Sequence, residues 1–287
     1  MLQIELDVFS GRPNPRWRLT PREEVEFVDR VMADWSVVRP VDEVESRLGY
    51  RGMVITGDSD GIGVLKARGL PPIFRLRETV NLDVSDVTER WLLHTSGADE
   101  MVVPEALDAS EAVVGSPRAT FSNGAEPTCE TGTRGCTIWW TSRNDLNTFW
   151  NGSTTRIQNN NCYNFASSLA TNTFAQPGRG SGQMFTALTI ANIKAAAYRD
   201  GYTSSCSGDR FEDYLCIWPN LDYHWYHRST DVSGSRRWAH KPGSTRATNL
   251  DSSGKIITNP ATCDRGRYTV DGSPTVFAPV SPKAKIK

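Results

Sequence analysis

Apolar and polar residues alternate along Gln3–Phe9, as they do in a β-strand that buries one face. A turn is predicted at Ser10–Pro15, where two prolines restrict the backbone and a glycine adds freedom. A helix should follow, because Thr20 and Glu23 match a capping box and Pro21 suits the first helical position. Its predicted buried face consists of Val25, Val28, Val31 and Met32.

Further along, the pattern predicts a strand at Gly52–Thr56 and a helix at about 85–94. Periodicity is weak from about Gly97 to Thr128, where acidic residues, serine, proline and glycine dominate. We therefore predict a small N-terminal α/β domain at 1–110, with a partner-binding or targeting role, and a linker at 111–128.

The remaining region, 129–287, has the pattern of an α+β domain with an antiparallel sheet. Its predicted strands are Thr137–Thr141, Tyr214–Trp218 and Asp222–Arg228, and its predicted helices are Cys162–Leu169 and Thr186–Arg199. Pro219 and Asn220 separate the last two strands, which is typical of a hairpin.

Composition and charge narrow the classes of partner. The chain has 287 residues and a formal net charge of -1, so no general attraction to nucleic acid or anionic lipid is expected. No apolar run is long enough to cross a bilayer, and Met1–Asp7 does not resemble a secretory signal. We therefore predict that the protein does not bind nucleic acid and has no membrane-spanning segment.

All six cysteines lie between Cys129 and Cys263. The short spacings Cys129–Cys136 and Cys206–Cys216 favour two local disulfides, and hence an extracellular or periplasmic protein. Neither spacing is a CxxC pair, so we predict no metal and no cofactor. Cys162 and Cys263 then remain, either as a third disulfide or as two free thiols.

Cys162 is the candidate nucleophile. It follows the polar run Asn159–Asn161 at the start of a predicted helix, where backbone N–H groups and the helix dipole favour a thiolate. A thiolate needs a base within hydrogen-bond reach, and His224 is the first choice, with His240 as the variant. Gln158 and backbone N–H groups would stabilise the oxyanion.

The strand that carries His224 also carries His227. Because side chains alternate along a strand, these two histidines should point to opposite faces, which disfavours a two-histidine metal site. The glycine-rich loop Phe174–Gly182 lacks the Lys-Ser or Lys-Thr of a phosphate loop. We interpret it as a flexible loop beside the Cys162 helix, where it could form one wall of a substrate groove.

A cysteine on a helix, followed by a histidine on a strand and a later polar residue, resembles the layout of papain-like cysteine hydrolases of the CHAP type. The resemblance covers roughly 159–226 and implies a papain-like fold for 129–287. The chain departs from that pattern because His224 lies inside an aromatic strand. It is also similar to uncharacterised bacterial proteins with three motifs, which stand here as Cys162–Ala166, Phe174–Gly178 and Trp238–Gly243.

Two functions from different classes follow. The first is a secreted bacterial two-domain thiol hydrolase, a cysteine peptidase or amidase acting on a peptide or on peptidoglycan-like substrates, with a protein partner for its N-terminal domain. The second is a non-catalytic, disulfide-stabilised extracellular binding or structural assembly protein, in which the cysteines are paired and a tryptophan-rich surface binds carbohydrate or protein.

Overall fold

The computed structural model divides the chain into two compact units. It describes residues 1–44, 46–76, 85–96, 129–131, 136–143, 145–231, 233–280 and 284–287. The first unit comprises Met1–Val8, Asn14–Glu45 and Gly49–Val114, and the second comprises Phe9–Pro13, Ser46–Leu48 and Gly115–Lys287. The predicted linker at 111–128 lies outside the described residues.

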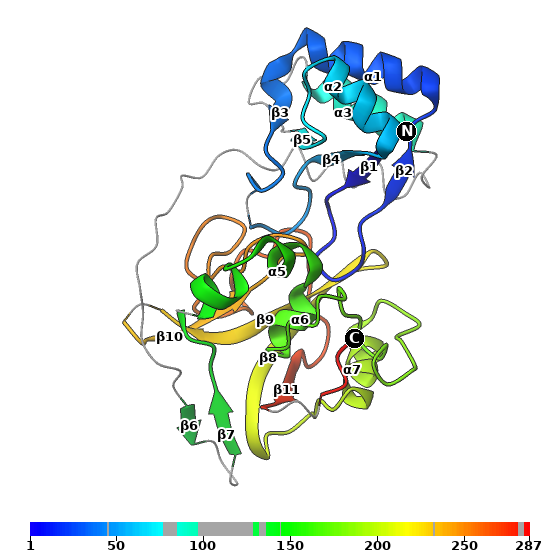
Figure 1. Cartoon of the computed structure of the whole chain (residues 1–287). Helices are drawn as coiled ribbons and strands as arrows, with labels where there is room; N and C mark the ends of the chain where they lie inside the picture. The colour runs from blue at the N-terminus through cyan, green and yellow to red at the C-terminus, as the bar shows by residue number, and fades with distance from the viewer. Residues whose placement is uncertain are drawn as a thin grey trace. The chain divides into compact units, whose positions relative to one another are not determined.

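The first unit is a layered α/β structure (Figure 1). Its strands are β1 (Leu2–Leu6), β2 (Arg16–Arg18), β3 (Val38–Arg39), β4 (Met53–Gly57) and β5 (Ile73–Leu76). Its helices are α1 (Pro21–Ala33), η1 (Trp35–Val37), α2 (Ser59–Ala67) and α3 (Ser85–Thr95). The strands pair antiparallel in the order β2-β1-β4-β5-β3.

Helix α1 begins as the sequence predicts. The Thr20 hydroxyl accepts from the Glu23 backbone N–H, and the Glu23 carboxylate accepts from the Thr20 N–H, which completes the capping box. The predicted buried face is partly wrong, because Val25 and Met32 are exposed. The buried stripe follows the i, i+3, i+4, i+7 spacing one position earlier, through Glu24, Phe27, Val28 and Val31.

A buried ion cluster stands at the end of β1. Asp7 is paired with Arg51 at 2.6 Å and with Arg75 of β5 at 2.9 Å, and all three side chains are almost fully buried. Burial alone would raise the pKa of Asp7, but the two guanidinium groups outweigh it and lower that pKa to about 2.

The second unit contains a six-stranded sheet among its described residues. The strands are β6 (Cys129–Thr131), β7 (Cys136–Trp139), β8 (Gly208–Trp218), β9 (Asp222–Thr230), β10 (Arg236–His240) and β11 (Thr275–Pro279). Their order is β10-β9-β8-β7-β6, with β11 beside β8. The predicted β8–β9 hairpin is confirmed, and every pair is antiparallel except β7 with β8.

The described residues of this unit also form the helical segments η2 (Asp145–Trp150), α5 (Thr154–Asn159), α6 (Cys162–Ala166) and α7 (Ile190–Arg199). The chain is thus a mixed α+β protein with largely antiparallel sheets. Helix α7 begins at Ile190, four residues later than predicted, because Thr189 is its N-cap and accepts from the Asn192 N–H. Helix α6 packs against β9 (Figure 1).

The two faces of the β8–β9 hairpin bury different side chains. Leu215, Ile217, Tyr223 and Trp225 share a hydrophobic cluster with residues of α6 and α7. The other face carries Tyr214, Cys216, His224 and Tyr226, which pair across the strands in register. Tyr268 packs against His224 on this second face. This division decides which candidate residues can meet.

We predict that Asp7→Asn destabilises the protein by about 3–5 kcal/mol in urea unfolding, because two buried guanidinium groups lose their counter-charge. Asp29→Asn is the matched control, since the Asp29–Arg68 pair is exposed and its loss should cost less than about 1 kcal/mol. Equal effects from the two variants would contradict the assignment.

The same cluster predicts a loss of stability in acid. The folded pKa of Asp7, about 2, lies below its ordinary value of 3.8, so its contribution is complete above pH 3.8 and is lost as the pH falls towards 2. The pKa difference corresponds to about 2 kcal/mol. Urea midpoints measured between pH 5 and pH 2 should fall less steeply for Asp7→Asn than for the natural protein.

Candidate functional site

Cys162 is the first residue of α6, as predicted. The Asn161 side chain caps this helix by accepting from the backbone N–H groups of Tyr163 and Asn164, both at 3.1 Å. The Asn164 side chain in turn accepts from the Asn161 N–H, which makes a capping box of two asparagines. Both amides are buried, so this polar turn fixes the helix rather than facing solvent.

The surroundings of Cys162 do not favour a thiolate. The side chain is fully buried in the cluster with Tyr223 and Trp225, and its sulfur lies 4.0 Å from the Tyr223 carbonyl oxygen. Burial raises the pKa of the Cys162 thiol well above its ordinary value, and the negative charge of Asp222 adds to that rise. The expected activation by the helix N-terminus is therefore outweighed.

His224 and His240 are brought together, but away from Cys162. His224 Nε2 lies 2.8 Å from His240 Nδ1, and His240 Nε2 lies 2.8 Å from the Leu250 carbonyl oxygen. The carbonyl can only accept, so we assign the proton of neutral His240 to Nε2, and His224 Nε2–H then donates to His240 Nδ1. The two imidazoles form one short hydrogen-bonded chain in the protein interior.

The sheet separates the predicted nucleophile from both predicted bases. Cys162 packs on the Tyr223 and Trp225 face of β9, whereas His224 and His240 occupy the opposite face. Proton transfer from a cysteine requires a base within hydrogen-bond reach, and this arrangement does not supply it. Gln158 lies in α5, where its backbone carbonyl accepts from the Ser244 hydroxyl.

His227 points away from His224, as predicted, and enters a polar cluster that the sequence did not reveal. Its Nδ1 lies 2.6 Å from Asp213, and its Nε2 lies 2.8 Å from the Thr141 hydroxyl and 3.5 Å from that of Ser168. Burial raises the pKa of Asp213 to about 6, although His227 opposes the rise. His227 and Asp213 are fully buried, so the cluster supports the core.

Asp222 organises a turn from the beginning of the chain. Its carboxylate accepts from the backbone N–H groups of Ser10 at 2.6 Å, Gly11 at 3.2 Å and Arg12 at 2.9 Å, and from the Tyr268 hydroxyl at 2.5 Å. Burial raises the pKa of Asp222, and these donors lower it in part. The aspartate thus fixes a segment 212 residues away in sequence.

Lys241, in the predicted Trp238–Gly243 motif, is a buried cation. Its ammonium group donates to the backbone carbonyls of Ile157, Asn160 and Gly243. Two of these carbonyls lie at the C-terminal end of α5, where the helix dipole favours positive charge. The motif therefore serves to join α5 to the turn after β10.

The glycine-rich loop is bound to Asp200 and packs against the residues near 285. Asp200 accepts from the N–H groups of Gly178 at 2.6 Å and Ser181 at 3.1 Å. A Cβ atom at Gly180 would lie 1.6 Å from the Lys285 carbonyl oxygen, so only glycine allows this approach. The Lys285 N–H donates to the Asp200 carbonyl oxygen.

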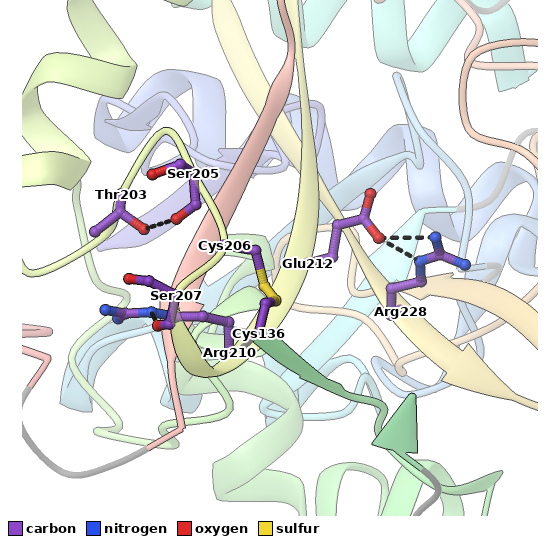
Figure 2. Close-up of a disulfide and its surroundings, with 8 residues drawn as sticks. All are labelled: Cys136, Thr203, Ser205, Cys206, Ser207, Arg210, Glu212 and Arg228. Atoms are coloured by element: carbon purple, nitrogen blue, oxygen red, sulfur yellow. Dashed lines mark hydrogen bonds and ion pairs between the residues drawn. A yellow bond between two sulfur atoms is a disulfide. The ribbon is translucent and has the colours of Figure 1, made fainter. Parts of the chain in front are cut away.

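Neither predicted disulfide is present. Cys136 of β7 is bonded to Cys206, just before β8, so it cannot pair with Cys129, nor Cys206 with Cys216 (Figure 2). The parallel pairing of β7 with β8 aligns Cys136 with Gly208 and brings these cysteines together across 70 residues. Cys162, Cys216 and Cys263 are free thiols.

Two further findings concern the described residues alone. None of the helices in that part of the chain combines the length and apolar composition needed to span a bilayer. Within the same residues, no three histidine, cysteine or acidic side chains gather as a candidate metal site.

Comparison with known proteins identifies one informative relative. The chain is 42% identical over 113 residues to Insoluble matrix shell protein 1 of Ruditapes philippinarum, and the match covers 38% of this chain and 74% of that protein. No family model matches the chain. No solved structure matches it either, so the papain-like resemblance stays a prediction.

This likeness corrects the first functional hypothesis. A thiol hydrolase acting on peptide or peptidoglycan is wrong for a chain whose relative is a shell matrix protein, and the bacterial cell-wall setting falls with it. The separation of Cys162 from His224 and His240 gives the physical reason, because the three residues do not form one site.

We predict that Asp222→Asn destabilises the protein by about 3 kcal/mol, because an amide nitrogen would face backbone donors that now share one carboxylate. Hydrogen exchange of the Ser10, Gly11 and Arg12 amides should accelerate together. Asp264→Asn is the control, since exposed Asp264 caps a local turn at Gly266 and its change should stay within about 0.5 kcal/mol. If the three amides stay equally protected from hydrogen exchange in the variant, the proposed role of the Asp222 carboxylate in fixing this turn is wrong.

Proposed function

The chain belongs to the family of Insoluble matrix shell protein 1, and from that premise we propose that it is a non-catalytic structural component of an insoluble extracellular matrix. The observation that carries this proposal is the 42% identity across 74% of that relative. The proposed role corresponds to the second function expected from the sequence, a disulfide-stabilised assembly protein.

The state of the polar residues supports a structural role. Asp200, Asp222 and Lys241 are buried, and each is hydrogen-bonded to backbone groups of a segment distant in sequence. Buried charges with satisfied partners fix loops in one conformation, so these three side chains are not available to a substrate. Three of the predicted catalytic residues, Cys162, His224 and His240, are likewise buried.

The disulfide supports the extracellular setting. A bond between Cys136 and Cys206 persists in oxidising surroundings, where a matrix protein would act. The proposed partners are other matrix components, protein or carbohydrate, rather than a substrate that is cleaved. A role of the first unit in binding such a partner remains part of the proposal.

Fractionation of the tissue that makes the protein tests this function. Extracellular matrix is washed with salt, then extracted with denaturant, and each fraction is analysed by mass spectrometry for peptides of this chain. We expect the peptides in the residue that resists salt, together with other matrix proteins. A chain confined to the cytosolic fraction, alongside a cytosolic marker, would refute the proposal.

A second measurement separates assembly from catalysis. The purified protein should sediment with the washed insoluble matrix, and Cys162→Ala should sediment to the same extent, because the buried thiol faces the core. Cleavage of matrix peptides by the natural protein, lost in Cys162→Ala, would contradict the non-catalytic role.

A further inference from the structure

Two of the free thiols belong to the same side of the β8–β9 hairpin. Cys216 of β8 pairs in register with His224 of β9, so it occupies the face opposite to Cys162. The segment that carries Cys263 reaches this face as well, because Tyr268 packs on His224 and Thr269 pairs with Ile217. Tyr226 follows His224 on that face by one alternation of the strand.

The segment that carries Cys263 is held against the same hairpin. Thr269 pairs with Ile217 through two backbone hydrogen bonds, of 2.7 and 2.9 Å. Tyr268 packs on His224, and its hydroxyl donates to Asp222. The Cys263 N–H donates to the Asn259 carbonyl, which orders the turn itself. Cys263 is therefore brought to the sheet by fixed neighbours.

Each thiol makes a weak hydrogen bond to a backbone carbonyl oxygen, which oxidation would remove at little cost. The Cys216 thiol is 3.6 Å from the His224 carbonyl oxygen, and the Cys263 thiol is 3.6 Å from that of Pro260. Both are weak S–H donors. Burial raises the pKa of each thiol while Arg265 lowers it, and a negative charge on Cys263 adds to the rise at Cys216. Arg265 therefore acts on the pKa of both thiols, and Cys263 acts on that of Cys216.

We propose that Cys216 and Cys263 are a second disulfide pair of this protein, formed by exchange with a small-molecule or protein disulfide in the oxidising environment. The other described thiol, Cys162, lies on the opposite face of β9. The bond would link β8 to the segment around Tyr268, across the face that holds the two imidazoles.

The exchange balances without another reagent. Half-buried Cys263 attacks the donor disulfide as a thiolate, forms a mixed disulfide and releases one donor thiolate. The Cys216 thiolate then attacks the Cys263 sulfur and releases the second. The donor gains the two electrons that the protein loses, and the two protons leave with the donor thiols.

Peptide mapping of the whole protein tests the pair. The folded chain is treated with oxidised glutathione, quenched with an alkylating agent in denaturant, digested without reduction and analysed by mass spectrometry. We expect a linked pair of peptides containing Cys216 and Cys263, with Cys162 recovered in alkylated form. Recovery of both cysteines as alkylated peptides, or of Cys263 bound only to glutathione, would overturn the proposal.

Variants separate this bond from a general effect of oxidation. Cys263→Ser should leave Cys216 alkylated after the same treatment, whereas Cys162→Ala should retain the linked peptides. In non-reducing thermal unfolding, oxidised natural protein should have a higher midpoint than Cys216→Ala/Cys263→Ala, by several degrees. A bond from Cys263 to any other cysteine would also refute the assignment, and mapping of the natural chain decides the matter even if a variant does not fold.

Discussion

Alternation of side chains along β9 is the constraint on which the second unit depends. Tyr223 and Trp225 turn to the face covered by α6 and α7, while His224 and Tyr226 turn to the face covered by the later loops. A strand cannot exchange these faces without a one-residue slip in register, which would bury the wrong set of side chains throughout the hairpin. The backbone itself therefore keeps the Cys162 thiol apart from the imidazoles of His224 and His240.

Buried charged residues fix the loops of the second unit that lie outside its sheet. Each of Asp200, Asp222 and Lys241 gathers backbone groups from segments that have little regular structure of their own. Burial of a charge is costly unless several hydrogen bonds compensate it, so such a residue favours one loop conformation over the alternatives. The long loops of this unit are ordered by these contacts, and this suits a protein whose proposed role is to persist in an assembly.

The sequence predicts correctly those features that depend on residues close together in the chain. The capping box at Thr20, the β8–β9 hairpin and the opposite orientations of His224 and His227 depend on spacing alone. Contacts between residues distant in the chain could not be predicted from the sequence. The Cys136–Cys206 bond follows from the parallel pairing of β7 with β8, and no local pattern specifies that register.

The prediction that Cys162, His224 and His240 form one site was wrong because it, too, depended on contacts between residues distant in sequence. Cys162 does begin a helix, but the face of the sheet on which that helix packs is a tertiary property. The order of cysteine, histidine and polar residue along the chain is shared by arrangements in which those residues meet and by others in which a sheet divides them.

The three hydrogen bonds of the Lys241 ammonium group have a consequence for how sequences of this family can vary. Three carbonyl oxygens converge on a compact ammonium group, and the planar guanidinium of arginine cannot present its donors in that geometry. An exchange that is usually neutral on a protein surface would therefore be excluded at this position, so a lysine here reports the retained junction between α5 and the turn rather than a general preference for positive charge.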